Sequence, residues 1–96
     1  MTNYDELPEH MQSGAREYIE DGKHPGSFLI SVLCNSLTES FSRADEINKT
    51  FLPVWVKWLV WDIPATAWGS EEKVMKWMGE KREEKRKRKR EEVSPE

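Results

Sequence analysis

Apolar residues recur at helical spacing in four segments of the chain, and no segment alternates apolar and polar residues for long enough to indicate a strand. The first segment begins at Pro8, a residue tolerated at the start of a helix, and ends at Gly22, a residue that commonly terminates one. The second presents a broad apolar face from Phe28 to Phe41 and should form the most buried helix. The pattern therefore predicts an all-α fold, a small bundle of about four helices.

A proline interrupts the third predicted helix. Residues 42–45 have the Ser-x-x-acid spacing of a capping box, and apolar residues then recur at steps of three and four from Ile47 to Trp61. Pro53 falls inside this run, where it removes one backbone hydrogen bond and clashes with the preceding turn. We therefore expect the helix to be kinked at Pro53 or to be broken there into two shorter helices.

The fourth predicted helix changes character along its length. Ser70 is a good N-cap for it, and apolar residues follow at helical spacing. Beyond Gly79 nearly every residue is charged. We therefore expect residues 1–79 to form the helical domain, and residues 80–96 to form a charged helical extension that ends in a disordered tail.

The charge of the chain is divided between these two parts. The net charge is −3. Residues 1–79 hold seven Lys or Arg and twelve Asp or Glu, a net charge of −5, whereas residues 80–96 hold eight and six, a net charge of +2. The basic run from Lys85 to Arg90 is the one feature that indicates nucleic-acid binding. Because glutamates flank the run at helical spacing, the sequence favours a solvent-exposed helix held by ion pairs.

Length and composition limit the class of protein. A chain of 96 residues with 36% hydrophobic residues has room for one small core, so we expect self-association to complete it. The longest apolar-rich segment, from Phe51 to Trp61, is far shorter than the roughly 20 residues that span a membrane, so no membrane role is expected. The chain has a single cysteine and no apolar leader at its first residues, and both features favour the cytoplasm.

Few residues of the chain are suited to catalysis. His10 and His24 are the only histidines, and neither has the spacing to cysteine or to the other histidine that a zinc site needs. Cys34 falls on the helix predicted to be buried, where a cysteine is usually a small core residue. No phosphate-binding loop or nucleophile elbow is present. We therefore expect neither an enzyme nor a bound metal or cofactor.

Two junctions, Gly26–Ser27 and Gly69–Ser70, place Gly-Ser at the start of a predicted helix. Free backbone N–H groups at such a start bind phosphate or carboxylate, although capping of the helix is the commoner role. Glu71 and Glu72 oppose an anion at the second junction, so the first is the better candidate. The candidate ligand-binding residues are therefore Lys23, Gly26, Ser27, Asn35 and Arg43.

Three tryptophans of the third predicted helix are candidates for an interface with another protein. Trp58 and Trp61 lie on its predicted apolar face, whereas Trp55 lies off that face and is expected to be exposed. The alternative is that Trp55 packs beneath the C-terminal helix. An exposed group of these three side chains would support self-association or contact with a partner protein.

Four short motifs occur between residues 25 and 73 of the chain. They are Pro25-Gly26-Ser27-Phe28-Leu29, Asn35-x-Leu37, Arg43-Ala44-Asp45-x-x-Asn48 and Trp68-Gly69-Ser70-x-x-Lys73. In this order they resemble the pattern of small, largely uncharacterised proteins that bacteriophages and prophages encode, and the similarity spans about residues 7 to 78. The resemblance implies a phage or prophage origin and a place in the cytoplasm of the host.

The small core, the lack of a catalytic constellation and this resemblance favour a non-enzymatic accessory protein, which counters host defence or regulates a host factor by stoichiometric binding. In one version, residues around Gly26 and Ser27 sequester an anionic small molecule such as a nucleotide. In the other, the acidic or aromatic surface inhibits a host protein by direct contact. Two further alternatives are a nucleic-acid-binding module that uses Lys85 to Arg90 and a structural homo-oligomer.

Overall fold

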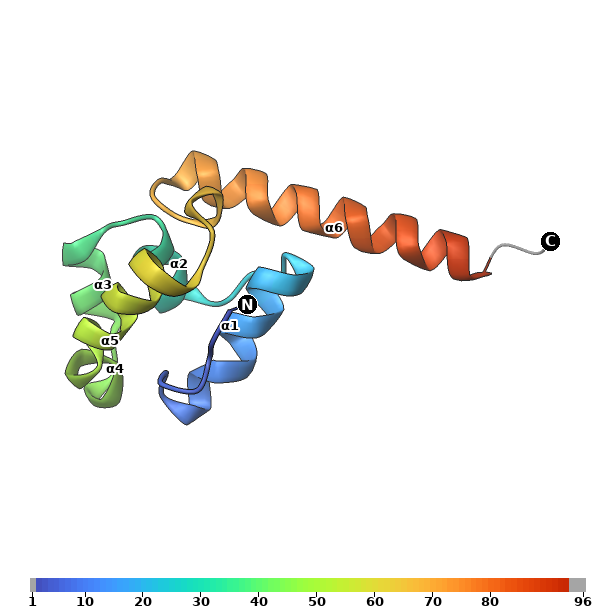
Figure 1. The fold of residues 1–96 in the computed structure, drawn as a ribbon. Helices are drawn as coiled ribbons and strands as arrows, with labels where there is room; N and C mark the ends of the chain where they lie inside the picture. Colours follow the sequence, from blue (N-terminus) through green and yellow to red (C-terminus); the bar gives the residue numbers. More distant parts are fainter. Residues whose placement is uncertain (1, 94–96) are drawn as a thin grey trace.

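The structure, a computed structural model, describes residues 2–93, and of residues 90–93 it describes the backbone. This part of the chain is helical and contains no strand, so the predicted all-α fold is confirmed (Figure 1). The helices are α1 (Glu9–Asp21), α2 (Ser27–Leu33), α3 (Leu37–Arg43), α4 (Glu46–Thr50), α5 (Leu52–Lys57) and α6 (Glu71–Val93), with a π-helical turn η1 (Trp58–Asp62) and a 3-10 turn η2 (Ala65–Ala67). None of the helices described is both long and apolar enough to cross a membrane.

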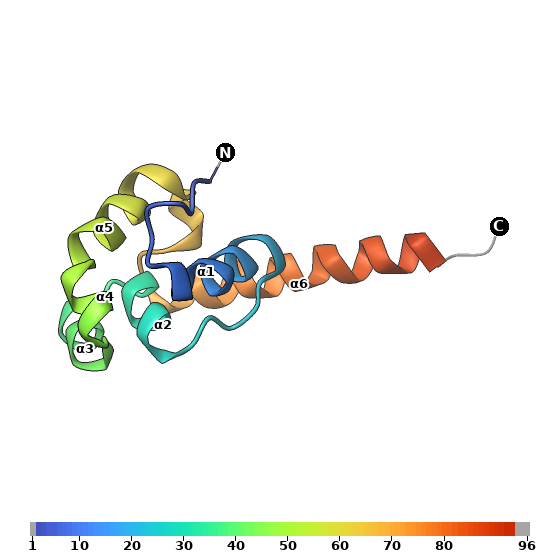
Figure 2. The same cartoon turned by 90° about the horizontal axis from the view of Figure 1, so that it is seen from below.

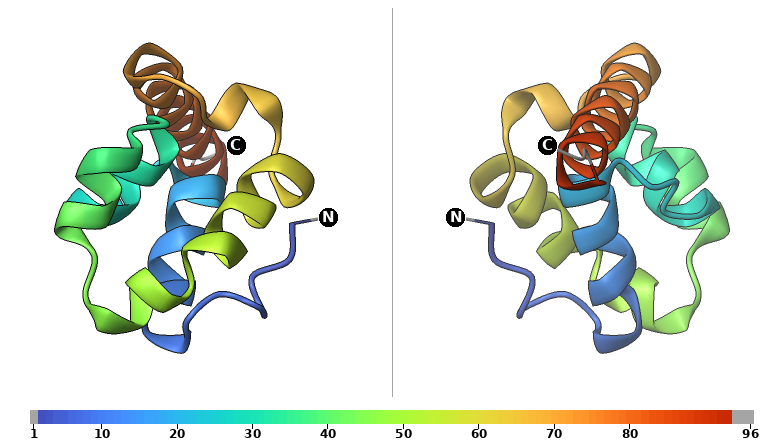
Figure 3. Two further views of the ribbon diagram at one scale, coloured as in Figure 1. Left: turned by 90° about the vertical axis from the view of Figure 1, so that its left-hand side faces the viewer. Right: turned by 90° about the vertical axis from the view of Figure 1, so that its right-hand side faces the viewer.

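The helices form a small body from which α6 projects. Figure 3 shows α1 in the middle of the body, with α2 and α3 on one side and with α5 and η1 on the other. The first half of α6 lies against α1, and its second half extends beyond the body in both side views (Figures 1 and 2). The molecule consequently measures 52 Å along its long axis, against 26 and 21 Å across it. The charged helical extension that the sequence predicts is confirmed as far as Val93, whereas Ser94–Glu96 lie outside the described residues.

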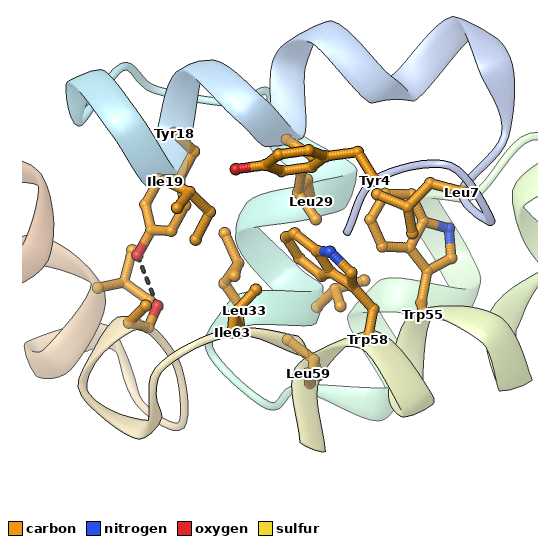
Figure 4. Close-up of a cluster of buried hydrophobic side chains, with 14 of the residues drawn as sticks. Tyr4, Leu7, Tyr18, Ile19, Leu29, Leu33, Trp55, Trp58, Leu59 and Ile63 are labelled. Carbon is orange, nitrogen blue, oxygen red and sulfur yellow. Dashed lines mark hydrogen bonds between the residues drawn. The ribbon is translucent and has the colours of Figure 1, made fainter. Parts of the chain in front are cut away.

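Aromatic side chains dominate the core (Figure 4). Trp55 contacts Phe28 and Trp58 in edge-to-face pairs, with ring centroids 5.7 and 5.6 Å apart. The other buried side chains of the core come from the N-terminal segment, α1, α2, η1 and the residue after it, η2 and the first turns of α6. The residues labelled in the close-up are Tyr4, Leu7, Tyr18, Ile19, Leu29, Leu33, Trp55, Trp58, Leu59 and Ile63.

The two ends of α1 and the start of α6 lie where the sequence predicts them. Pro8 precedes the first helical residue of α1, and Gly22 ends α1 in the left-handed conformation with φ of 70°. The backbone N–H of Gly22 donates to the carbonyl of Tyr18 over 3.0 Å. At α6, the hydroxyl of Ser70 accepts a hydrogen bond of 3.2 Å from the backbone N–H of Lys73. The start and the end of α1 and the start of α6 are therefore fixed by residues next to them in the sequence.

The second predicted helix is in fact two helices. The chain turns sharply at Asn35, which has φ of 65°, so α2 ends before it and α3 begins after it. Asparagine adopts this left-handed conformation more readily than other residues with a side chain beyond Cβ. The prediction of one apolar face from Phe28 to Phe41 was wrong, because the turn leaves Leu37 and Phe41 on the surface.

The third predicted helix is broken rather than kinked. α4 ends before Phe51, and Pro53 lies in the first turn of α5, where its missing N–H is tolerated. Asp45, and not Ser42, caps the start of α4, since its carboxylate accepts a 2.7 Å hydrogen bond from the N–H of Asn48. The segment is therefore broken, the alternative to a kink that the sequence left open, and the break lies at Phe51, two residues before Pro53.

The apolar face predicted from Ile47 to Trp61 was wrong. Ile47 and Trp61 are exposed, whereas Trp55, which was placed off that face, is buried. The break at Phe51 and the wider π-helical turn of η1 each change the angular spacing of residues along the segment. Residues before and after these two features therefore do not share one helical period, and the face counted across them is not a single face.

Candidate functional site

Arg43 contacts the second turn of α2, one helical turn beyond the predicted Gly26–Ser27 site. Its guanidinium donates to the hydroxyl of Ser31 over 3.2 Å, and that hydroxyl donates to the carbonyl of Ser27 over 3.0 Å. Ser27 does not cap α2, because it is the first helical residue, and Gly26, with φ of 97°, occupies the cap position. Gly26 and not Ser27 is therefore the cap residue of α2, and Arg43 reaches a residue one helical turn beyond Ser27.

The other two predicted ligand-binding residues lie elsewhere. Asn35 follows the C-terminal end of α2, so the whole helix separates it from Gly26. Lys23 follows α1 and forms an exposed ion pair with Glu17, in which the nitrogen and oxygen are 3.8 Å apart. The structure does not bring the five predicted residues into one site.

The three tryptophans predicted to form an interface do not share a surface. Trp55 and Trp58 are 0% and 2% exposed, whereas Trp61 is 77% exposed. Trp55 contacts Phe28 of α2 and Trp58 of η1, and its ring N–H donates to the side-chain oxygen of Asn48 over 3.3 Å. The expectation of an exposed three-tryptophan surface was therefore wrong for Trp55 and Trp58.

A shallow apolar groove between α3 and α5 is the feature that the sequence did not reveal. Its volume is about 60 Å³, and its lining comes from α2, α3, α5, η1 and the turn between α2 and α3. The lining residues are Val32, Asn35, Ser36, Leu37, Ser40, Leu52, Trp55, Val56 and Leu59. Leu37 and Val56, on opposite sides of the groove, are 75% and 52% exposed. We call this surface, with its lining residues, the α3–α5 groove.

The turn at Asn35 creates this groove. If α2 and α3 were one helix, Leu37 would continue the buried face of α2. The left-handed turn instead directs α3 across the end of α2, and Phe41 follows Leu37 by one helical turn on α3. The only signal for this in the sequence is the pair Asn35-Ser36, a residue suited to a left-handed turn followed by one that often precedes a helix.

Local contacts shift the pKa values of Asp45 and Cys34 in opposite directions. The pKa of Asp45 is lowered, first by the hydrogen bond from the N–H of Asn48 and then by His10, whose ring nitrogen lies 3.0 Å from its carboxylate. Burial raises the pKa of the Cys34 thiol, and Glu71 and Glu39 raise it further. A raised pKa disfavours the reactive thiolate. Among residues 2–89, whose side chains the structure describes, no group of three His, Cys, Asp or Glu could hold a metal ion.

A larger hollow lies where α1 meets α6. It has a volume of about 720 Å³, and its lining includes Glu20, Asp21 and Glu84 as well as Lys81, Lys87 and Arg88, so acids and bases balance. Its aromatic wall is Trp77, whose ring N–H donates to the carbonyl of Tyr18 over 3.2 Å and whose ring contacts the Lys81 ammonium at 4.7 Å. These contacts attach α6 to α1.

Comparison with known proteins gives no relative for this chain. No protein family, no curated protein and no solved structure matches it.

Proposed function

We propose that the chain is a non-enzymatic accessory protein of the bacteriophage type, which acts by binding one partner protein stoichiometrically through the α3–α5 groove. The phage origin rests on the resemblance of its sequence motifs. The binding surface rests on one observation: large apolar side chains stand exposed beside an apolar groove. They are Leu37 and Val56, which line the groove, and Phe41 and Val60, each four residues further along the chain. Contiguous apolar surface of this kind marks interaction sites on small proteins.

The dimensions of the groove favour a protein over a small molecule. Pockets for small-molecule ligands usually enclose about 300–1,000 Å³, whereas this groove encloses about 60 Å³. An apolar side chain from a partner suits a hollow of this size. Asn35 and Ser36 at its edge supply polar groups, and an apolar centre with a polar rim is the usual anatomy of a protein interface.

The charge of the body favours a basic partner. Residues 1–79 carry a net charge of −5, so two copies brought together would repel each other, whereas a basic protein would be attracted. The proposed partner is therefore a basic host protein that places an apolar side chain in the groove. This is the version in which the chain inhibits or regulates by protein contact. Sequestration of a nucleotide has less support, because the five candidate residues do not converge.

The test compares two matched substitutions in the full chain. Val56→Asp puts a charge into the groove, and Met75→Asp puts the same charge on α6 outside it, at a side chain that is 60% exposed. Each tagged variant is produced in bacterial cells, and any co-purifying protein is identified, purified and mixed with the chain. We expect the wild type and Met75→Asp to form a 1:1 complex in light scattering, and Val56→Asp to lose it.

Circular dichroism shows whether each variant keeps its helical content, so that loss of binding is not loss of folding. Equal binding by Val56→Asp and the wild type would remove the groove from the proposal. A purified wild type that dimerises, together with a monomeric Val56→Asp, would assign the groove to self-association and overturn the proposal of a host partner.

A further inference from the structure

The cations of α6 are not distributed evenly around the helix. Arg82, Lys85, Arg86 and Lys89 follow one another at i, i+3, i+4 and i+7, the spacing of one helical face. Together with Lys23 and Asp21, they line a hollow of about 320 Å³ beside the end of α1. We call the five cations of this hollow the cationic face. It is distinct from the α3–α5 groove.

Close packing of α1 against α6 builds the cationic face. A Cβ atom on Gly22 would lie 2.5 Å from the carbonyl oxygen of Met78, so only glycine permits this approach. The carbonyl of Gly22 accepts a 3.2 Å hydrogen bond from the guanidinium of Arg82. Lys23 is the next residue, and the same contact therefore places it beside the helix.

The acids near the cationic face leave it positively charged. Asp21 lies 3.8 Å from Lys85, and Glu83 lies 3.3 Å from Arg86. Glu17 forms a third ion pair, with Lys23. Three acids therefore pair with cations of a face that has five, so the cationic face keeps a net charge of about +2. Exposed ion pairs of this kind are weak, and a phosphate group that binds arginine or lysine can replace them.

Two glutamates of the same helix, Glu80 and Glu84, are turned away from the cationic face. Glu80 and Glu84 lie two residues from Arg82 in opposite directions along the helix, about 200° around its axis. Glu84 accordingly lines the other hollow, together with Lys87 and Arg88. The basic run from Lys85 to Arg90 is thus divided between two surfaces, which the sequence alone does not show.

We propose that the cationic face binds the phosphate backbone of a nucleic acid. From Arg82 to Lys89 the helix rises by about 10 Å, a length along which one strand of a duplex presents roughly three phosphates at about 3.4 Å of duplex axis each. Residues 80–92 contain no apolar residue that could enter a lipid bilayer, so a membrane surface is the less suitable polyanion. The cationic face carries no aromatic or amide side chain, so it contacts phosphates without reading the base sequence.

The test uses two double variants that remove the same charge from the same helix. Lys85→Gln with Lys89→Gln changes the cationic face, whereas Lys87→Gln with Arg88→Gln changes the other surface. Fluorescence anisotropy measures binding of the full chain to a labelled 20-nucleotide single strand and to duplex DNA across a range of salt concentrations. We expect the first double variant to weaken binding at least tenfold and to make the slope of log K against log salt shallower by about two. The second should weaken binding less than threefold.

Three results would overturn the proposal. The first is an absence of binding by the wild type at about 50 mM salt, where phosphate contacts are strong. The second is an equal loss in both double variants, which would show attraction to net charge without a defined face. The third is binding to vesicles of phosphatidylglycerol and phosphatidylcholine in place of nucleic acid. None of these results bears on the α3–α5 groove, because Val56→Asp leaves every residue of the cationic face unchanged.

Discussion

The buried hydrogen bond between Tyr18 and Ala67 allows a test of the fold in which one atom is removed. The hydroxyl of Tyr18 donates to the carbonyl of Ala67 over 2.7 Å, and both residues are completely buried (Figure 4). The bond joins α1 to the 3-10 turn η2, which are 49 residues apart in sequence. Tyr18→Phe keeps the ring in place but leaves the carbonyl without this partner.

The expected loss of stability follows from that unpaired carbonyl. A buried polar group left without a partner costs about 1–3 kcal/mol. For a domain of this size each kcal/mol lowers Tm by roughly 4–8 °C. Tyr18→Phe should therefore unfold at a clearly lower urea concentration, with an unchanged dependence of the unfolding free energy on urea. Circular dichroism at increasing urea concentration measures both quantities.

Tyr4→Phe is the matched control. Tyr4 is also buried, with its ring centroid 6.3 Å from that of Trp58, but its hydroxyl has no hydrogen-bond partner in the described part of the chain. Removing this hydroxyl should leave the free energy of unfolding unchanged or raise it by up to about 1 kcal/mol. Equal losses in Tyr4→Phe and Tyr18→Phe would show that the hydrogen bond to Ala67 is not the cause, and the reasoning would then fail.

Three further predictions concern pH and one close contact. Burial raises the pKa of Tyr18 above its unfolded value of about 10. The protonated hydroxyl therefore contributes fully to stability below pH 10, and this contribution declines as the pH rises further. In an alkaline titration, the free energy of unfolding should fall less in Tyr18→Phe than in the wild type. The lowered pKa of Asp45 has the opposite sign, so its contribution is present above pH 4 and is lost as the pH falls further, and Asp45→Asn should remove that part of the acid dependence of Tm. Gly22→Ala should lower the free energy of unfolding by more than about 1 kcal/mol, measured in urea, because alanine strains the φ of 70° and its Cβ would lie 2.5 Å from the carbonyl of Met78.

The sequence was sufficient for the features that local chemistry decides. Gly22, Pro53 and Ser70 each have a backbone preference or a capping side chain that acts on neighbouring residues, and all three mark helix boundaries in the structure. The same local chemistry explains why the all-α class and the helical extension were predicted correctly. No distant contact is needed to decide these features.

The features that the sequence did not reveal depend on residues far apart in the chain. Trp55 was assigned to the surface by a helical period counted from Ile47 to Trp61, but the break at Phe51 changes the face on which it lies. The α3–α5 groove exists only because Asn35 redirects α3. The cationic face needs Lys23 to lie beside α6, and only the tertiary contact of Gly22 places it there. Periodicity along one helix contains none of this information.

The projection of α6 beyond the body divides its amides into two groups that exchange hydrogen by different routes. As far as Met78 the helix packs on the core, so those amides should exchange only when the whole domain opens. Residues 80–92 have no apolar side chain, so their amides should exchange through local fraying that leaves the melting temperature unaffected. A polyanion bound there would slow deuterium uptake of the outer turns, and because the cationic face includes Lys23 of the folded body, it should also raise the melting temperature.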